Sequence, residues 1–297
     1  TLFPYTTLFR SLGMDTKSVI ARFEAERQAL ALMDHPNIAK VFDGGVTQTG
    51  RPYFVMELVR GVRITDFCDE ARLSTEARLR LFVQVCQAVQ HAHQKGVIHR
   101  DLKPSNVLLA RGPTGAFEPK ILDFGTARAT AGDPFGSGKT GFTPLYGAPE
   151  QWDPAIGPPS PATDVYSAAL AFLEAATLAR PHGAEESLAG LMRAVMSGAG
   201  IPRLAAARPD LPIGLDAVFV RATQTRPEHR YRDAGELRAA IAAARGALSP
   251  GAWTAPTTTA SGVHYPAMPS PPGTSTTASV VSPSVTSPQG RSTGSGL

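Results

Sequence analysis

Three short motifs, in one order and at set distances, constrain this chain more than any other feature of its sequence. The first is His99-Arg100-Asp101-Leu102-Lys103-Pro104-Ser105-Asn106. Asp123-Phe124-Gly125 starts 22 residues after Asp101, and Ala148-Pro149-Glu150 ends 27 residues after Asp123. Either triplet alone would be weak evidence for a fold or a function, because short matches arise by chance. All three in this order and spacing favour one fold and one chemistry.

Together, the three motifs form the signature set of protein kinases. From roughly Leu12 to Leu248 the chain therefore resembles the Ser/Thr protein kinases, specifically the bacterial members of that superfamily. The resemblance implies an α+β, two-lobed fold. Residues 12–58 would form a small lobe with an incomplete sheet, and residues 59–248 a mostly helical large lobe. The predicted elements, a small β-containing start and a mostly helical remainder, favour the same class.

The resemblance implies transfer of the ATP γ-phosphate to Ser or Thr hydroxyls of proteins, with Mg²⁺ or Mn²⁺ as the metal. This chemistry depends on positioning and charge neutralisation, with little covalent work by the protein. Asp101 would orient the substrate hydroxyl or accept its proton. Asn106 and Asp123 would supply hard oxygen ligands for the metal. Lys103 would lie near the transferring phosphate as a point charge.

Two places in the sequence bear on the substrate class. In the family, a lysine at the position of Lys103 accompanies Ser/Thr rather than Tyr specificity. Phe142-Thr143-Pro144, just before the third motif, favours the same specificity. Family members usually have glycine where Phe142 stands, so the loop geometry is expected to differ here. The long segment from Asp123 to Glu150 argues against a small-molecule kinase, because it builds a platform for peptide substrates.

Nucleotide binding is also placed by the resemblance. The segment Tyr53 to Val59 resembles the strand that leads into the hinge between the lobes, with Met56 as the gatekeeper residue. The backbone of Glu57 and Val59 would bond the adenine edge. Leu108 would pack against the adenine face. The alternative for Met56 and Leu108 is an ordinary position in the core.

The segment between the second and third motifs is expected to regulate the site. Residues 136–141 (Gly-Ser-Gly-Lys-Thr-Gly) match a phosphate-loop pattern, but they neither follow an apolar strand nor open a helix, the context that such loops need. We expect a switchable loop, with Ser137 and Thr140 as sites of autophosphorylation in a transient dimer and Thr143 in the same regulatory set. Arg100 would pair with the phosphorylated residue, because a guanidinium holds phosphate bidentately.

Supporting roles follow from the same resemblance. Glu150 and Arg230 would form a buried ion pair that braces the segment after the third motif. Asp164 would hold the backbone of the catalytic loop from its helix. A stack of three further side chains is expected: His99, Phe124 and Leu30.

The beginning of the chain is difficult to reconcile with an intact small lobe. Thr1 to Ser11 resemble a translated sequencing adapter, and the alternative is a genuine β-prone leader. Neither a glycine-rich loop nor a Val-Ala-Ile-Lys-like strand precedes Glu26, so this residue lacks the lysine partner that the family uses. We expect that the natural protein begins further upstream and that the chain as written is a poor catalyst. A pseudokinase or scaffold that binds partners without transfer is the alternative.

Local patterns predict the elements that carry these motifs. Strands are predicted at Ile38–Phe42, Tyr53–Leu58, Val107–Leu109 and Lys120–Leu122. Helices are predicted at Asp15–Asp34, Ile64–Ala71 and Ser74–Lys95, and from Asp164 to about Leu248. The turn formers Asp43-Gly44-Gly45 should follow the first strand. Ser74 and Gly96 should cap the helix between them.

Composition excludes several classes. A net charge of +4 falls well short of the basic stripe that nucleic-acid binding needs. No apolar run is long enough to span a membrane. Two cysteines exclude a disulfide framework and fit a reducing compartment, so a cytoplasmic kinase domain is expected. His91 and His93 do not share a helix face, which argues against a metal site.

The C-terminal segment differs from the rest in composition. Two thirds of residues 249–297 are Ser, Thr, Pro or Gly. Such a segment has too little apolar surface to offset the entropy of ordering, so we expect a disordered tail or linker. Many bacterial relatives carry a membrane span or sensor domain after such a linker, and membrane anchoring of the whole protein therefore stays an alternative.

Overall fold

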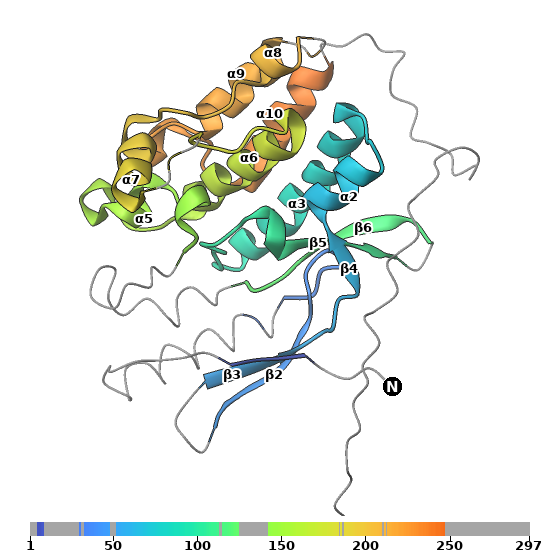
Figure 1. Cartoon of the computed structure of the whole chain (residues 1–297). Helices are drawn as coiled ribbons and strands as arrows, with labels where there is room; N and C mark the ends of the chain where they lie inside the picture. Colours follow the sequence, from blue (N-terminus) through green and yellow to red (C-terminus); the bar gives the residue numbers. More distant parts are fainter. Residues whose placement is uncertain are drawn as a thin grey trace, which may run out of the picture. The chain divides into compact units, whose positions relative to one another are not determined.

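The computed structural model of the chain describes residues 5–8, 30, 33–47, 52–112, 115–124, 142–183, 185, 187–209, 211 and 213–246. The chain divides into two units, Thr1–Pro266 and Ala267–Leu297, and all described residues belong to the first. Within it, the first sheet comes early in the chain, and the second contains strands from both sides of the first two helices; the remaining helices follow (Figure 1). In the described part of the chain, no helix is long and apolar enough to cross a membrane.

The first sheet is antiparallel and has the strand order β1-β3-β2. Its strands are β1 (Tyr5–Leu8), β2 (Val41–Val46) and β3 (Pro52–Met56). β1 pairs with β3 from Tyr5 opposite Met56 to Leu8 opposite Tyr53. The adapter-like segment thus provides one edge of this sheet, and none of its four paired residues is a lysine.

The turn predicted at Asp43-Gly44-Gly45 is wrong, because these residues lie inside β2. The strand starts at Val41 rather than Ile38, which forms an isolated bridge with Ile121. The neighbouring strand explains the glycine: a Cβ on Gly45 would lie 2.8 Å from the Tyr53 hydroxyl oxygen, its cross-strand partner. Gly45 is therefore required because the Tyr53 ring lies against it, and not because the chain turns there.

The second sheet has the order β4-β5-β6 and comprises β4 (Gly61–Arg63), β5 (Val107–Arg111) and β6 (Phe117–Ile121). The predicted strands at Val107–Leu109 and Lys120–Leu122 are confirmed as parts of a longer hairpin, although Leu122 lies beyond it. β4 and β5 contact the helix that follows β4, and β6 contacts the next helix. The first motif ends just before β5 and the second begins just after β6, so both lie at the same end of the hairpin, where Val107 pairs with Ile121.

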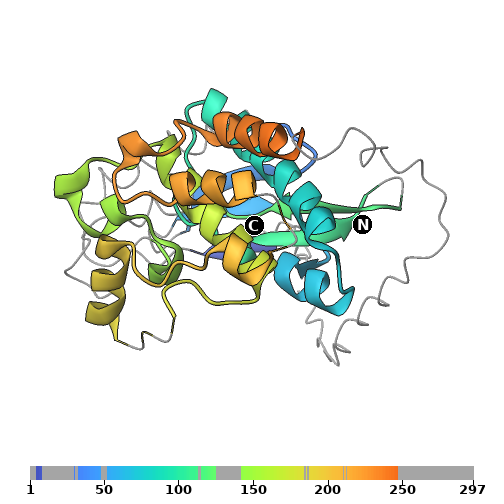
Figure 2. The same ribbon diagram turned by 90° about the horizontal axis from the view of Figure 1, so that it is seen from above.

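The helices form the larger part of the fold. They are α2 (Ile64–Glu70), α3 (Thr75–Gln94), α5 (Pro149–Trp152), α6 (Pro161–Thr177), α7 (Leu188–Ser197), α8 (Leu204–Ala207), α9 (Ile213–Ala222) and α10 (Ala234–Gly246). Short 3₁₀ turns lie at η1 (Pro104–Asn106), η2 (Pro144–Tyr146), η3 (Pro154–Ile156) and η4 (Pro227–His229). α3, α6, α9 and α10 pack on one another, as Figure 2 shows from above.

The helix predictions differ in outcome. Those at Ile64–Ala71 and Ser74–Lys95 are confirmed to within a residue or two as α2 and α3. The stretch after Asp164 is helical but interrupted, and its first helix starts at Pro161, because proline suits the first helical position. In the predicted helix from Asp15 to Asp34, only Leu30, Met33 and Asp34 are described, and of these Leu30 alone is helical.

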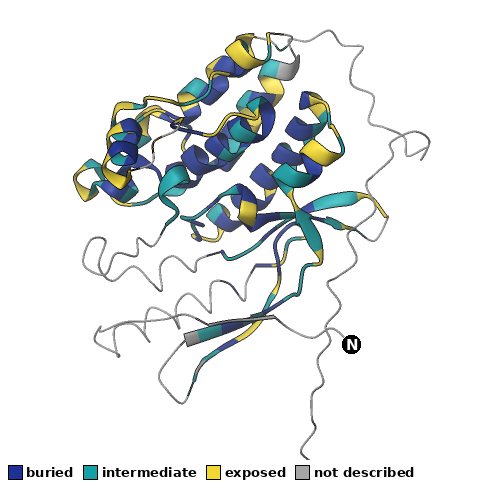
Figure 3. Ribbon diagram, in the orientation of Figure 1, coloured by how far each residue is buried: buried dark blue, intermediate teal, exposed yellow. Residues whose placement is uncertain are grey.

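α6 is the centre of the helical core, and most of its length is buried (Figure 3). One apolar cluster joins it to α3, α9 and α10 and extends to both sheets through Phe54, Met56 and Ile121. Because α6 is buried on nearly all sides, a polar residue in its first turn can only face other protein groups. Asp164 is such a residue, with no exposed surface.

The start of α3 offers a test of helix capping. The Ser74 hydroxyl oxygen accepts a hydrogen bond from the Ala77 N–H at 3.2 Å. Replacing Ser74 by alanine leaves that N–H without its partner and should lower the free energy of unfolding by about 0.5–2 kcal/mol. Urea unfolding measures the change. Ser74→Asn is the matched control and should keep wild-type stability, because asparagine caps equally well; equal loss in both variants would contradict the capping role.

Candidate active site

The loop of the first motif, residues 99–106, is held in place by the carboxylate of Asp164. Its Oδ2 accepts hydrogen bonds from the His99 N–H at 2.8 Å and the His93 Nε2–H at 2.9 Å, and its Oδ1 accepts one from the Arg100 N–H at 2.8 Å. The prediction that Asp164 holds the catalytic-loop backbone is confirmed. A carboxylate only accepts, so His93 carries its hydrogen on Nε2, and Nδ1 faces the Ala234 N–H at 3.5 Å.

Asp164 is ionised more readily than an ordinary aspartate. Burial opposes ionisation, but the hydrogen bond from His93, the charges of His93 and His99, and the Arg100 N–H outweigh it and lower the pKa of Asp164 below its usual 3.8. A group whose pKa is lower in the folded state stabilises the fold above its unfolded pKa. That stabilisation is lost as the pH falls through the lower folded value.

The folded protein should therefore lose stability as the pH falls from about 5 to about 3, and Asp164 should contribute part of the loss. Urea unfolding at both pH values measures it. The Asp164→Asn variant, less stable at pH 5, should show a smaller loss between the two. Asp34→Asn, at an exposed carboxylate, is the control and should match the wild type. An NMR titration that places the Asp164 carboxyl pKa above 4 would contradict this expectation.

Asp101 and Lys103 meet the segment just before the third motif. The Thr143 N–H donates to Asp101 Oδ1 at 2.6 Å. The Lys103 ammonium donates to Asp101 Oδ2 at 2.7 Å and to the Thr143 hydroxyl oxygen at 2.5 Å. A carboxylate, an ammonium and a hydroxyl thus form one hydrogen-bonded group that joins segments 40 residues apart in sequence. Asp101 and Lys103 stay partly exposed, so other molecules can reach them.

Asn106 and Asp123 are the two predicted metal ligands. The Asn106 side-chain NH₂ donates to the Asp101 carbonyl oxygen at 2.9 Å, which directs its other polar atom, Oδ1, elsewhere as an acceptor. The Asn106 carbonyl also accepts from the Leu122 N–H at 2.8 Å, which ties the loop to the residue before Asp123. Burial raises the pKa of Asp123 above its usual 3.8, against the opposing charges of His99 and Lys103. One carboxylate and one amide oxygen fit Mg²⁺, which takes few protein ligands beside phosphate oxygens.

Three of the predicted nucleotide-binding residues, Met56, Glu57 and Val59, lie at the end of β3 or just after it. Met56 is buried in the main apolar cluster, and Leu108 is half-buried on β5. The Glu57 N–H donates to the Lys40 carbonyl oxygen at 2.8 Å. In the described residues the Glu57 carbonyl and the Val59 N–H make no hydrogen bond, so both are available to a ligand.

A buried ion pair braces the region after the third motif. The Arg230 guanidinium donates to both carboxylate oxygens of Glu150, each at 2.8 Å, and both side chains are 0% exposed. Thr163 adds a third donor to Glu150 at 2.7 Å. The remaining guanidinium hydrogens of Arg230 go to three carbonyl oxygens, and its Cζ lies 4.8 Å from the centre of the Tyr166 ring.

Some predicted residues are not placed. Glu26, Ser137 and Thr140 lie outside the described residues, as do Gly125 and the tail from residue 249. Arg100 is described and half-buried, but the segment it would bind is not. The stack of His99 and Phe124 is confirmed, with ring centres 4.7 Å apart, and Leu30 belongs to the same apolar cluster as Phe124.

The sequence does not indicate the roles that two residues have at this site. The Gln151 side-chain NH₂ donates to the Arg100 carbonyl oxygen at 2.7 Å, and His93 holds Asp164. His93 lies one helical turn after the buried residue Val89, so its place on the buried stripe of α3 is the only local signal. Nothing near Gln151 in sequence indicates its partner, which lies 51 residues away.

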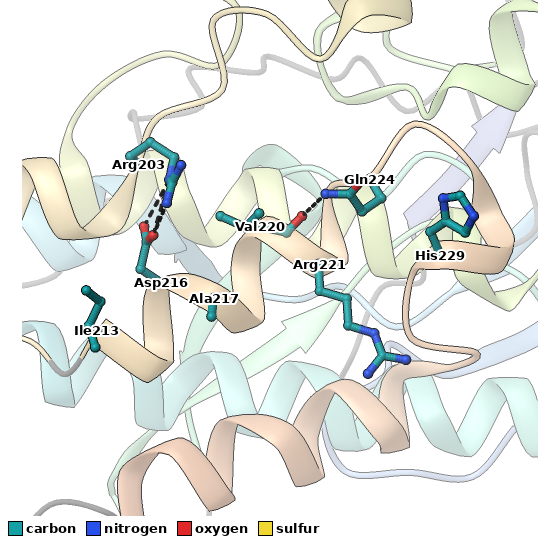
Figure 4. A pocket seen from close by; sticks show the side chains of 8 residues that line it. All are labelled: Arg203, Ile213, Asp216, Ala217, Val220, Arg221, Gln224 and His229. Atoms are coloured by element: carbon teal, nitrogen blue, oxygen red, sulfur yellow. Dashed lines mark hydrogen bonds and ion pairs between the residues drawn. The ribbon is translucent and has the colours of Figure 1, made fainter.

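A hollow of about 470 Å³ lies on α9, away from these residues (Figure 4). Its wall includes Arg203, whose guanidinium binds the Asp216 carboxylate, and Ile213, Arg221 and His229. It contains none of the predicted site residues. We therefore assign the candidate active site to the cluster of Asp101, Lys103, Asn106 and Asp123. The assignment depends on the chemistry of these side chains and not on the volume of a pocket.

Comparisons with known proteins identify the family of the chain. The family model of the protein kinase domain matches residues 11–209. The chain is 37% identical over 238 residues to the serine/threonine-protein kinase PknA of Mycobacterium tuberculosis and 34% identical over 230 residues to PknB of the same organism. These matches cover 78% and 75% of this chain, but 52% of PknA and 35% of PknB, so the chain spans about half of one relative and a third of the other. The crystal structure of the M. tuberculosis PknI kinase domain matches with a TM-score of 0.58 and 26% identity, over 80% of this chain and 84% of that domain.

Proposed function

Because the chain belongs to the protein kinase family, we propose that its described part supplies the site of ATP-dependent phosphoryl transfer to Ser or Thr hydroxyls of proteins. The single observation that carries the proposal is the hydrogen-bonded group of Asp101, Lys103 and Thr143. It places a proton acceptor and a cation side by side, partly exposed, on a loop fixed by a buried carboxylate. Phosphoryl transfer needs such prepositioned charges.

Each side chain has a role that its contacts support. Asp101 orients the acceptor hydroxyl and takes its proton, because its carboxylate is held from both sides and cannot rotate freely. Lys103 offsets negative charge on the transferred group. Asn106 and Asp123 would hold Mg²⁺, which neutralises charge on the nucleotide phosphates when it is bound.

The nucleotide base has its own proposed contacts. The Glu57 carbonyl and the Val59 N–H offer one acceptor and one donor, the pair that the edge of adenine needs. Met56 limits the depth of this region, and Leu108 contacts the base from one side. Glu26 is proposed, by family resemblance, to take part in nucleotide binding, but not as a contact of the base.

Regulation is proposed on the family pattern. Ser137 and Thr140 would be autophosphorylated within a transient dimer, and Arg100 would bind the resulting phosphate. Thr143 connects that segment to Asp101 and Lys103, so a change in the segment reaches the site directly. We place the kinase domain in the cytoplasm.

A second candidate is a binding module without transfer. One observation favours it: β1 (Tyr5–Leu8), one of the two strands that pair with β3, contains no lysine to hold the phosphates. Such a module would bind a protein partner without needing nucleotide.

The decisive experiment incubates the purified chain with radiolabelled ATP, Mg²⁺ and a generic protein substrate, followed by phosphoamino-acid analysis. The proposal expects phosphoserine and phosphothreonine, formed more slowly than the roughly 1–100 per second of intact kinases. Labelling no greater than that of a buffer control, together with partner binding independent of nucleotide, would overturn it in favour of the binding module.

A further inference from the structure

The segment from Glu57 to Arg60 joins β3 to β4 without regular structure of its own. Both of its ends are fixed. At one end the Glu57 N–H donates to the Lys40 carbonyl oxygen at 2.8 Å. At the other, Gly61 pairs with Ala110 and approaches so closely that a Cβ on it would lie 2.6 Å from the Leu109 carbonyl oxygen. The position of the backbone atoms between them depends on these two anchors.

The side chain of Glu57 makes a further contact, to β6. Its Oε2 accepts from the Lys120 ammonium at 3.0 Å and from the Lys40 N–H at 3.1 Å. The Lys120 and Glu57 side chains are only 22% and 29% exposed. Partial burial reduces the screening of this pair by water, so it should be stronger than a fully exposed one.

Lys120 lies between several residues of the proposed site. It is the cross-strand partner of Leu108 on β5 and comes three residues before Asp123. The next residue, Ile121, exchanges backbone hydrogen bonds with the segment before β2, from its N–H to the Asn37 carbonyl at 2.8 Å and from the Ala39 N–H to its own carbonyl at 2.9 Å. Lys120 is therefore mounted on a fixed strand, whereas Glu57 begins an irregular segment.

From this geometry we propose that Lys120 is a positioning residue for the nucleotide, acting through Glu57. It holds the start of the segment whose Glu57 carbonyl and Val59 N–H meet the adenine edge. The ligand in this inference rests on the proposed function, but the anchoring itself does not. Lys120 touches neither the phosphates nor the acceptor hydroxyl, so its loss affects nucleotide affinity rather than the transfer step.

The test replaces Lys120 by methionine, which keeps the length of the side chain and removes its charge. The KM for ATP should rise about threefold to tenfold, while kcat changes less than twofold. Lys120→Arg should restore the wild-type KM. Lys40→Met is the matched control: the Lys40 side chain is 59% exposed and pairs with Asp34, while the contacts of Lys40 to Glu57 involve only its backbone. A fall in kcat at unchanged KM, or an equal effect of Lys40→Met, would overturn the proposal.

Amide hydrogen exchange without nucleotide decides the matter independently of activity. In Lys120→Met the Glu57 amide should exchange faster, while an amide of buried α6, such as that of Leu170, keeps its wild-type rate. Unchanged exchange at Glu57, or equal acceleration at Leu170, would overturn the anchoring role. A wild-type chain that fails to bind ADP would contradict the proposed function alone, because the exchange result stands without a ligand.

Discussion

Replacing Arg230 by methionine is expected to lower the free energy of unfolding by about 3–5 kcal/mol. The substitution removes both donors from Glu150, whose side chain is 0% exposed, and leaves its charge buried with Thr163 as the remaining side-chain donor. Three carbonyl oxygens that Arg230 serves, those of Ala162, Gln224 and Thr225, lose a partner as well. Losses of this size follow when one member of a buried pair is removed, because an uncompensated charge remains.

Thermal unfolding measures the effect. For a domain of this size each kcal/mol shifts the melting temperature by about 2–4 °C, so the Arg230→Met variant should melt roughly 6–20 °C lower. Arg232→Met is the control: that arginine is 81% exposed in its pair with Glu236, and such pairs contribute at most about 1 kcal/mol. The double variant Glu150→Leu/Arg230→Met should recover much of the loss, because neither charge is then buried alone. A single variant as stable as the control would refute this account.

Converting Asp101 to asparagine should reduce phosphoryl transfer about 10²- to 10⁴-fold, the usual contribution of a positioned acid or base. Asparagine has the same shape and still offers an oxygen to the Thr143 N–H, so the loop should keep its conformation. It cannot take a proton at neutral pH. The rate at saturating ATP should therefore fall, while nucleotide affinity stays near the wild-type value.

Single-turnover transfer from radiolabelled ATP and ADP affinity by calorimetry measure the two quantities separately. Asp43→Asn is a suitable control, because Asp43 lies exposed on β2 and asparagine can keep its hydrogen bond to the Gly44 N–H. Equal transfer by Asp101→Asn and the wild type would remove Asp101 from the proposed mechanism.

Local sequence signals predict a helix or strand correctly where the residues at its two ends mark its beginning and its end. α3 begins after the Ser74 cap and ends before Gly96, whose φ of 73° suits glycine. The same reasoning fails at β2, where Gly44 and Gly45 predict a turn. Glycine is needed there because Tyr53 on the adjacent strand lies so close. A contact between two strands cannot be predicted from the residues around the glycine alone.

The motifs predict which residues gather at the site, but not what holds them. Asp101, Asn106 and Asp123 can be read from the sequence, because their chemistry demands those residue types. The Thr143 N–H and His93 cannot, since one is a backbone group and the other binds a partner 71 residues away. Such contacts depend on how α3, α6 and the segment before α5 pack. The family resemblance anticipates Asp164 and the Glu150–Arg230 pair only because related chains share that packing.

Two residues of the site, Arg100 and Asp123, have left-handed backbones, with φ of 68° and 56°. This conformation costs residues with a Cβ about 1–2 kcal/mol, less for aspartate than for arginine, and costs glycine almost nothing. Evolution toward greater stability alone would therefore drift to glycine at both positions. Arginine and aspartate at these positions therefore hold a less stable backbone than glycine would, which is the kind of local strain that is stored at functional sites.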